Sequence, residues 1–247
     1  GESTTDPLSY YDNNVGGTIS LLAEMKNSGV SNIIFSSTCS TYQQTNKLIS
    51  ELTPQNPMNP YGRSKLMTEN ILQDFSSANQ FRHMILRYFN AAGADIEGKI
   101  GENHNPETHL IPLAIRASID TSSQLELYGL DYPTEDGSAI RDYIHVNDLA
   151  TAHVKALEYM LQGGACKTFN LGTGAGYSVL QIVKTIEAIT NKPVDYVIKD
   201  RREGDPAKLV ADPSLAMREL NWRPDNSEIS NIVHSAFLWQ KKLLDYA

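Results

Sequence analysis

Tyr61 and Lys65 stand four residues apart in a segment that reads Asn-Pro-Tyr-Gly-Arg-Ser-Lys, and this spacing constrains the chain more than any other feature. Apolar residues recur at helical spacing from Leu66 to Phe75, and Pro60 precedes Tyr61 where helices tend to begin. Residues four apart share one face of a helix, so the two side chains should project together. A phenol titrates near ~10, and a neighbouring ammonium group favours its anion. The pair therefore predicts a proton shuttle in which Lys65 lowers the pKa of Tyr61.

A run of small hydroxyl residues, Ser36-Ser37-Thr38, follows the apolar, strand-like segment Ser31–Phe35. This order places the hydroxyl groups at the carboxyl end of a strand, which is the edge where ligands bind in open α/β sheets. A bare Tyr-x-x-x-Lys spacing occurs on many exposed helices, so the hydroxyl run is what makes it informative. Strand, hydroxyl and Tyr-x-x-x-Lys together resemble the short-chain dehydrogenase/reductase superfamily, in its extended branch that modifies sugar nucleotides.

Helices and strands are expected to alternate in the first part of the chain. A helix from Leu8 to Asn27, the strand before the hydroxyl run, the helix of the Tyr-x-x-x-Lys pair and a strand over Met84–Phe89 follow one another. This order is typical of an α/β protein with a doubly wound, Rossmann-like parallel sheet. Shorter elements and loops follow. We therefore expect a Rossmann domain in residues 1–93 and mainly a smaller α+β substrate domain in residues 94–247, with some segments returning to the first domain.

The later elements are expected from periodicity and turn residues. A strand is predicted over Leu125–Gly129, and helices are predicted over His109–Ser118, Leu149–Leu161, Ser178–Ile189 and Ile229–Leu244. Asp148 and Ser178 precede two of these helices and are the predicted N-caps, since a side-chain oxygen there can accept a backbone N–H.

No glycine fingerprint opens the chain. Dinucleotide-binding folds of this kind begin with a strand, a Gly-x-x-Gly-x-x-Gly turn and a helix, where backbone amides meet the pyrophosphate. The Gly-rich piece Gly172–Gly176 lacks the third glycine and lacks an acidic residue some ~20 positions further on. We therefore expect that the amino-terminal portion with the first strands is absent, and that the exposed sheet edge and helix faces reduce stability.

Composition excludes several classes of protein. The 247 residues are 40% hydrophobic, which is enough for a substantial core. The net charge of -8, without any run of Lys and Arg, argues against a nucleic-acid partner. Cys39 and Cys166 make neither a disulfide framework nor a metal spacing, so no metal is expected and a reducing cytoplasm is the predicted location. No signal peptide or membrane span is recognisable, and no membrane partner is expected.

Several short blocks, in the same order and from the first residue to the last, together resemble the UDP-glucose 4-epimerase family. Besides the hydroxyl run and the Tyr61 segment, these blocks are Tyr10–Val15, Arg87–Asn90, Tyr132–Gly137, Arg141–Val146 and Arg201–Asp205. A set of blocks in the right order is far more specific than any one of them. The resemblance implies a homodimer, and it implies that the family's glycine fingerprint precedes the first residue.

The resemblance also implies a reaction. Bound NAD would take a hydride from carbon 4 of a UDP-hexose, the 4-keto sugar would turn over, and the hydride would return to its other face. UDP-galactose and UDP-glucose would thus interconvert. Tyr61 would be the base for the 4-hydroxyl, Lys65 would lower its pKa and bind the nicotinamide ribose, and Thr38 would bridge the sugar hydroxyl and the phenol.

Further binding residues follow from the resemblance. Arg141 and Arg202 would hold the diphosphate, because a guanidinium fork matches two phosphate oxygens. The alternative for both is surface charge paired with Asp142 and Glu203. The other substrate-binding residues would be Asn90, His109, Tyr128 at the uracil and Asp205 at the ribose. The residues facing the nicotinamide half of NAD would be Asn13, Ser36, Tyr61, Lys65, Tyr88 and Phe89.

Two residues of types that are often catalytic, His145 and Cys39, are expected to serve packing rather than catalysis. His145 lies in an alternating, strand-like block without a second histidine at ligand spacing, so a packed, hydrogen-bonded side chain is expected. Cys39 has no neighbouring Lys or His to lower its pKa and reads as a small packing residue. One departure from the family follows Thr38, where Tyr42-Gln43 replaces the usual Tyr-Gly, so the loop is expected to differ locally.

Three alternatives to a UDP-glucose 4-epimerase were weighed. A dehydratase would place an Asp-Glu pair after the hydroxyl, whereas Cys39 and Ser40 follow Thr38, which disfavours dehydration. An epimerase for N-acetylated or uronic UDP-sugars stays open, because acceptance depends on pocket volume. A fragment unable to hold NAD is the third alternative, and we expect the isolated polypeptide to be inactive or nearly so.

Overall fold

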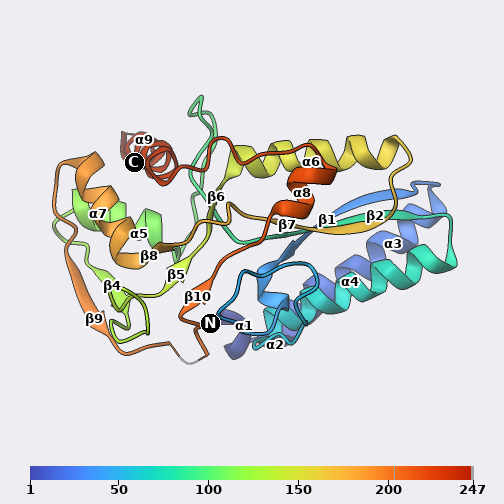
Figure 1. The fold of residues 1–247 in the computed structure, drawn as a ribbon, viewed down its shortest axis with the longest axis horizontal. Coiled ribbons are helices and arrows are strands. Elements are labelled where there is room, and N and C mark those ends of the chain that lie inside the picture. The colour runs from blue at the N-terminus through green and yellow to red at the C-terminus, as the bar shows by residue number, and fades with distance from the viewer. Residues whose placement is uncertain (203, 246–247) are drawn as a thin grey trace.

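The computed structural model describes residues 1–202 and 204–245 (Figure 1). The elements run in the order α1 (Glu2–Thr5), α2 (Pro7–Tyr11), the π-helical turn η1 (Asp12–Gly16), α3 (Gly17–Asn27), β1 (Asn32–Thr38), the 3-10 turn η2 (Cys39–Thr41), α4 (Pro60–Ala78), β2 (Arg82–Tyr88), β3 (Asn90–Ala92), α5 (Leu110–Ile119), β4 (Leu125–Tyr128), β5 (Ile140–Arg141), β6 (Tyr143–His145), α6 (Val146–Leu161), β7 (Lys167–Leu171), β8 (Tyr177–Ser178), α7 (Val179–Thr190), β9 (Tyr196–Lys199), β10 (Lys208–Leu209), α8 (Ser214–Glu219) and α9 (Ile229–Asp245). None of these helices combines the length and the apolar character needed to cross a membrane.

A parallel sheet with the strand order β1-β2-β7 organises one half of the structure (Figure 1). In its register Phe35 pairs with Ile85, and Leu86 pairs with Phe169. Side chains alternate along β2, so Ile85 packs against α3 and α4 on one face while Met84 and Leu86 pack against α6 and α8 on the other. Helices on both faces of a parallel sheet confirm the predicted doubly wound, Rossmann-like α/β fold.

A second hydrophobic core lies beside the first, among α5, α7, α9 and β4 (Figure 1). Its fully buried side chains include Ile115, Ile182, Ile186 and Ile232. The remaining strands form small sheets: β4 pairs with β9 and β3 with β6, both parallel, while β5 lies between β10 and β8. Strand β3 follows directly after the carboxyl end of β2 in the chain, and the small sheet of β3 and β6 leads towards this second core.

Helix α4 begins where the sequence predicts it. Asn59 is its N-cap, with the side-chain Oδ1 accepting the Gly62 N–H at 2.8 Å, and Pro60 is the first helical residue. Leu72 is fully buried against the sheet. The cap, the proline and the buried face together fix the first turn, which carries Tyr61.

The predicted helix from Leu8 to Asn27 is interrupted by the π-helical turn at Asp12–Gly16. The Asn14 carbonyl accepts hydroxyl hydrogen bonds from Thr18 at 2.6 Å and from Thr68 on α4 at 3.2 Å. At the end of this turn the Gly17 N–H bonds to the Asp12 carbonyl, five residues earlier, so the helix is wider there. Of the apolar side chains on α3, Leu22 is buried, whereas Ile19 is 53% exposed.

The predicted cap at Asp148 is wrong, and the one at Ser178 is confirmed. Helix α6 starts earlier, with His145 as N-cap, whose Nδ1 accepts the Asn147 N–H at 3.1 Å. Asp148 is buried instead, and its carboxylate holds the loop before α9 by accepting the backbone N–H of Asn226 at 3.0 Å. Ser178 makes a capping box with Gln181 at the start of α7.

Candidate active site

A cavity of about 470 Å³ opens where β1 and β2 end. This volume lies within the usual range of small-molecule sites. The sequence-predicted site residues that line it are Thr38, Tyr61, Tyr88, Phe89, Asn90, His109 and Arg141. Five separate segments of the chain supply these side chains, so the fold brings together a large part of the predicted site.

Thr38 and Tyr61 meet in this cavity. The hydroxyl run is not a loop, because β1 continues through Thr38, where its side chain is buried. Burial raises the pKa of the Tyr61 phenol, and the nearby Thr38 side chain acts in the opposite direction. The Lys65 ammonium group lies 6.0 Å from the centre of the Tyr61 ring. Burial is the largest cause of the Tyr61 pKa shift, and the lowering of this pKa by Lys65 stays a prediction.

Lys65 is held against β1. Its Nζ donates to the Ser36 carbonyl oxygen at 3.1 Å, and burial lowers the pKa of the ammonium group. The Ser36 hydroxyl lies 3.2 Å from Nε2 of His153, whose Nδ1 lies 2.7 Å from the Leu149 carbonyl. Since a carbonyl only accepts, Nδ1 carries the proton and Nε2 accepts from Ser36. His153 was not singled out in the sequence, where nothing marks it apart from other helical histidines.

Asn13 lies away from this group. It is exposed on the π-helical turn η1, its amide is 3.5 Å from the Asn14 side chain, and it is not among the described residues that line the cavity. Its neighbour Asn14 is the better-connected residue, because its amide donates to the Ser64 hydroxyl of α4 at 2.9 Å.

The two predicted diphosphate arginines occupy different surroundings. Arg141 reaches the cavity, and its guanidinium pairs with the Asp205 carboxylate at 2.5 Å. Arg202 stacks on Tyr128 with its guanidinium carbon 4.0 Å from the ring centre, and neither residue is among the described ones that line the cavity. Glu203, the other candidate partner of Arg202, lies outside the described residues.

Asp142 does not pair with Arg141, which excludes that alternative. Its buried carboxylate accepts the backbone N–H groups of Thr173 at 2.9 Å and of Gly174 and Ala211 at 3.1 Å. Burial nevertheless raises the pKa of Asp142. The Gly172–Gly176 loop therefore directs its amides at the protein's own carboxylate rather than at a pyrophosphate, in agreement with its rejection as a fingerprint.

One buried polar atom near Arg141 lacks a partner. The Tyr132 hydroxyl has no hydrogen bond to any residue that the structure describes. Burial raises the pKa of Tyr132, while the charges of Asp205 and Arg141 act on it in opposite directions, so the phenol lies close to both. A buried hydroxyl without a partner costs free energy, which favours a polar ligand or water beside this ion pair.

His145 and Cys39 are structural, as predicted. His145 is 1% exposed, and its Nε2 lies 3.0 Å from the Ser235 hydroxyl. Cys39 is buried under the cavity, and burial raises its thiol pKa to about 12. Neither group is therefore poised as a nucleophile.

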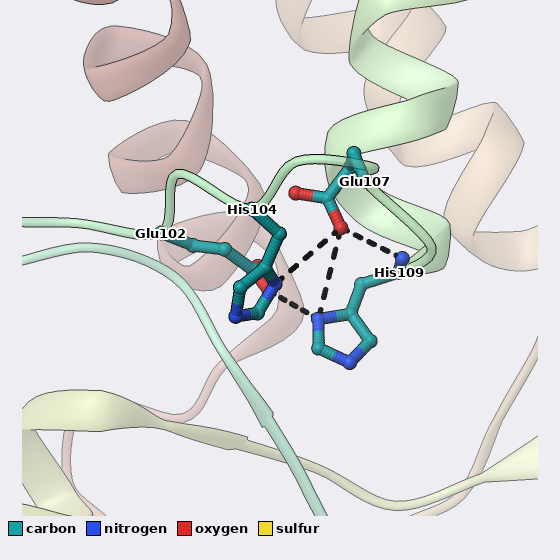
Figure 2. Close-up of side chains that lie close together, drawn as sticks. All are labelled: Glu102, His104, Glu107 and His109. Carbon is teal, nitrogen blue, oxygen red and sulfur yellow. Dashed lines mark hydrogen bonds and ion pairs between the residues drawn. The ribbon is translucent and has the colours of Figure 1, made fainter. Parts of the chain in front are cut away.

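One cluster at the cavity wall was not predicted from the sequence. Glu102, His104, Glu107 and His109 lie in the loop before α5, and one ligand atom from each lies within 4.8 Å of the others (Figure 2). Glu102 and His109 also line the cavity. The prediction of no metal rested on the cysteines and on His145, whereas the spacing Glu-x-His-x-x-Glu-x-His was the available signal. The Glu102 carboxylate raises the pKa of His109.

Fold and site together define a class: a Rossmann-like α/β protein with a Tyr-x-x-x-Lys helix beside a hydroxyl at the carboxyl end of a strand. Comparison with known proteins refines it. The chain belongs to the NAD dependent epimerase/dehydratase family, whose family model matches residues 1–172.

Three of the similar proteins, all named UDP-glucose 4-epimerase, show the extent of the likeness. The chain is 47% identical to a UDP-glucose 4-epimerase of Rhizobium leguminosarum bv. trifolii, over 98% of this chain and 74% of that protein. The solved UDP-glucose 4-epimerase of Brucella ovis in complex with NAD superposes with a TM-score of 0.94 at 48% identity, over 97% of this chain and 74% of that one. The enzyme of Bifidobacterium longum in complex with NAD+ and UDP gives 0.91 at 40% identity, over 98% and 73%.

Proposed function

We propose that this chain carries the sugar-facing and nicotinamide-facing groups of a UDP-glucose 4-epimerase that interconverts UDP-galactose and UDP-glucose. The observation that carries the proposal is the meeting of Thr38 and Tyr61 in one cavity with Asn90, His109 and Arg141. This set contains a proton-transfer pair and a cation. A nucleotide sugar needs both, since its hydroxyl reacts while its diphosphate must be held.

In this proposal Tyr61 takes the proton of the sugar 4-hydroxyl and later returns it. NAD, when bound, supplies the acceptor and donor of the hydride at carbon 4. The Thr38 hydroxyl, which donates to Ser40 Oγ at 3.2 Å and accepts the Ser40 N–H at 3.1 Å, would turn towards the phenol and the sugar to relay the proton. The raised pKa of Tyr61 means that the free phenol is protonated near neutral pH, so proton removal depends on groups that bind with the ligands.

The donor set at the sheet edge fits the nicotinamide half of a dinucleotide. Lys65 and Ser36 lie together at β1, and Tyr88 and Phe89 line the cavity at the end of β2. We propose that Lys65 binds the ribose hydroxyls and that the two aromatic residues flank the nicotinamide ring. The exposed Asn13 would approach the cofactor from η1.

On the substrate side, Arg141 is proposed to bind the diphosphate and Asp205 the ribose, with the orphaned Tyr132 hydroxyl as an additional donor. Arg202 and Tyr128 would close over the uridine as a stacked pair. Asn90 and His109 would hold the sugar and phosphate from the opposite wall.

We also propose a domain division and an oligomeric state. Residues 1–93, joined by the returning elements α6, β7 and α8, would form the cofactor domain, and most of residues 94–247 would form the substrate domain. A homodimer in the cytoplasm, without membrane or nucleic-acid partners, is proposed from the family resemblance. The 247 residues contain no glycine fingerprint, so we further propose that the isolated chain turns over little substrate.

Binding and turnover test the proposal separately. Calorimetric titration with UDP should show saturable binding that Arg141→Met weakens by roughly tenfold or more and that Arg116→Met, at an exposed arginine on α5, leaves unchanged. Equal binding by the Arg141 variant would remove the diphosphate assignment. Assay of the isolated chain with NAD and UDP-galactose at the rate of its relatives would contradict the proposed inactivity.

A chimaera tests the chemistry. The amino-terminal segment of the Rhizobium relative, placed before residue 1, should restore conversion of UDP-galactose. Tyr61→Phe in this chimaera should lower turnover by about 100-fold or more and leave UDP binding intact. Full turnover by that variant would refute the role of Tyr61, and preferential turnover of an N-acetylated UDP-sugar would favour the other epimerase.

A further inference from the structure

We propose that Glu102, His104, Glu107 and His109 form a binding site for a zinc-like divalent cation. The four residues lie within one loop segment between β3 and α5. Figure 2 shows both imidazole rings turned towards the carboxylates of Glu102 and Glu107. Each ring presents Nδ1, the same nitrogen in both cases. The proposal concerns metal binding alone and does not depend on the proposed reaction.

The donor geometry is close to that of a four-coordinate site. Zinc binds imidazole nitrogen and carboxylate oxygen at about 2.0 to 2.2 Å, which places tetrahedral donors about 3.4 Å apart. His104 Nδ1 lies 2.9 Å from Glu102 Oε1 and 3.7 Å from Glu107 Oε1, and His109 Nδ1 lies 3.8 Å from Glu107 Oε1. Small rotations of the half-exposed histidines would bring all four donors to bonding distance.

The loop is held in place before any ion arrives. The Glu102 carbonyl accepts the indole N–H of Trp239 on α9 at 2.9 Å. Glu107 Oε1 accepts the backbone N–H of Thr108 at 2.7 Å and of His109 at 2.9 Å, and the Glu107 side chain is only 3% exposed. A buried carboxylate fixed by backbone amides is a pre-positioned ligand, and it lowers the ordering cost of binding.

Donor chemistry selects the class of ion. Two nitrogens and two oxygens without a thiolate suit zinc and its neighbours in the first transition row, whereas magnesium and calcium prefer oxygen alone. Two carboxylates also balance the double charge of the ion. Without a metal ion the two carboxylates leave the cluster negatively charged unless the histidines are protonated. A cluster of protonated histidines paired with carboxylates is therefore the alternative explanation of the same contacts.

Zinc titration of the intact chain distinguishes the two accounts. Calorimetry with zinc chloride should give one saturable site per chain. His104→Ala, which changes an exposed side chain outside the main cavity, should weaken binding by roughly tenfold or more, since even the outer hydrogen-bond partners of metal ligands are worth about that much. His234→Ala, at an exposed histidine on α9, is the matched control and should bind zinc as the wild type does.

The exposed thiol of Cys166 is the main competing ligand. Cys166→Ser should keep the zinc site, and cobalt bound in its place should show a tetrahedral visible spectrum without a thiolate charge-transfer band. Zinc should raise the midpoint of thermal unfolding of the wild type and of the His234 variant, but not of the His104 variant. Loss of binding in Cys166→Ser, equal binding by the His104 variant, or no saturable binding would overturn the proposal.

Discussion

Glu69 on α4 and Arg87 on β2 form an ion pair of 2.5 Å inside the protein, with side chains 0% and 5% exposed. Glu69 also accepts from the Ser37 hydroxyl of β1 at 2.5 Å, and Arg87 donates to the Tyr42 hydroxyl at 2.7 Å. The pair thus joins helix α4 to both neighbouring strands, one turn beyond Lys65. It fixes the position of the helix that presents Tyr61.

Glu69→Gln is expected to destabilise the fold by about 3 to 5 kcal/mol, because it leaves the Arg87 charge buried without a counter-charge. The free energy of unfolding in urea measures this effect. The control is Glu158→Gln, which breaks an exposed pair with Lys155 and should change stability by less than about 0.5 kcal/mol. A cost for Glu69→Gln as small as that of the control would mean that solvent or rearrangement compensates the buried charge.

Gly62 marks the closest approach of α4 to the loop after β1. A Cβ atom on Gly62 would overlap the Ser40 carbonyl oxygen and lie 2.9 Å from the Pro57 Cβ. Gly62→Ala should therefore push the first turn of α4 away from Thr38 and Ser40. In the chimaera we expect turnover to fall by about 100-fold, the usual cost of displacing a reacting group by an ångström.

The matched control for this change is Gly17→Ala on α3, where a Cβ meets nothing within 4 Å. Alanine is the better helix former, so this variant should keep turnover and gain slightly in stability. Wild-type turnover by Gly62→Ala would show that the contact between α4 and the loop relaxes without moving Tyr61.

The fold could be predicted from the sequence where local signals agree. Asn59, Pro60 and the apolar spacing after Tyr61 all favour one helix, and α4 appears at that place. The break in the first helix and the start of α6 were missed because contacts between distant segments decide them. Asn14 bonds to α4, and Asp148 bonds to the loop before α9, which no local pattern reveals.

The sequence predicted which residues lie in the site better than it predicted their pKa values. Thr38, Tyr61 and Arg141, which the resemblance named as site residues, line one cavity. The resemblance did not reveal that burial dominates the Tyr61 pKa, because burial depends on the packing of segments far apart in the sequence. The roles of these residues stay predictions until the variants are assayed.

The two cysteines should differ sharply towards alkylating reagents. Burial raises the thiol pKa of Cys39 to about 12, whereas Cys166 is exposed. At pH 8 the folded chain should therefore take up one iodoacetamide per chain, and the urea-unfolded chain should take up two, because only the thiolate reacts. Mass spectrometry counts the adducts. Cys166→Ser should remain unmodified when folded, and rapid labelling of Cys39 in it would show that the cavity floor opens.

His145 should make stability depend on pH. Burial lowers its pKa, although the charges of Asp148 and Asp95 oppose this. Its Nδ1 accepts the Asn147 N–H and its Nε2 faces Ser235, whose hydroxyl donates to the Ile232 carbonyl, so the neutral Nε2–H tautomer fits. Protonation would place a second donor against the Asn147 amide and break the cap of α6.

The unfolded histidine titrates near ~6.5, above the lowered folded value. The contribution of neutral His145 to the free energy of unfolding is therefore fully present above the unfolded pKa. It is lost as the pH falls from the unfolded pKa through the lower folded pKa, because the unfolded state binds the proton first. Urea unfolding between pH 7.5 and 5 should show this slope. His145→Gln should reduce it, leaving the part due to His83, whose pKa burial also lowers, and the exposed control His234→Gln should keep it. An unchanged slope in His145→Gln, or an NMR signal for protonated His145 at pH 6, would contradict the assignment.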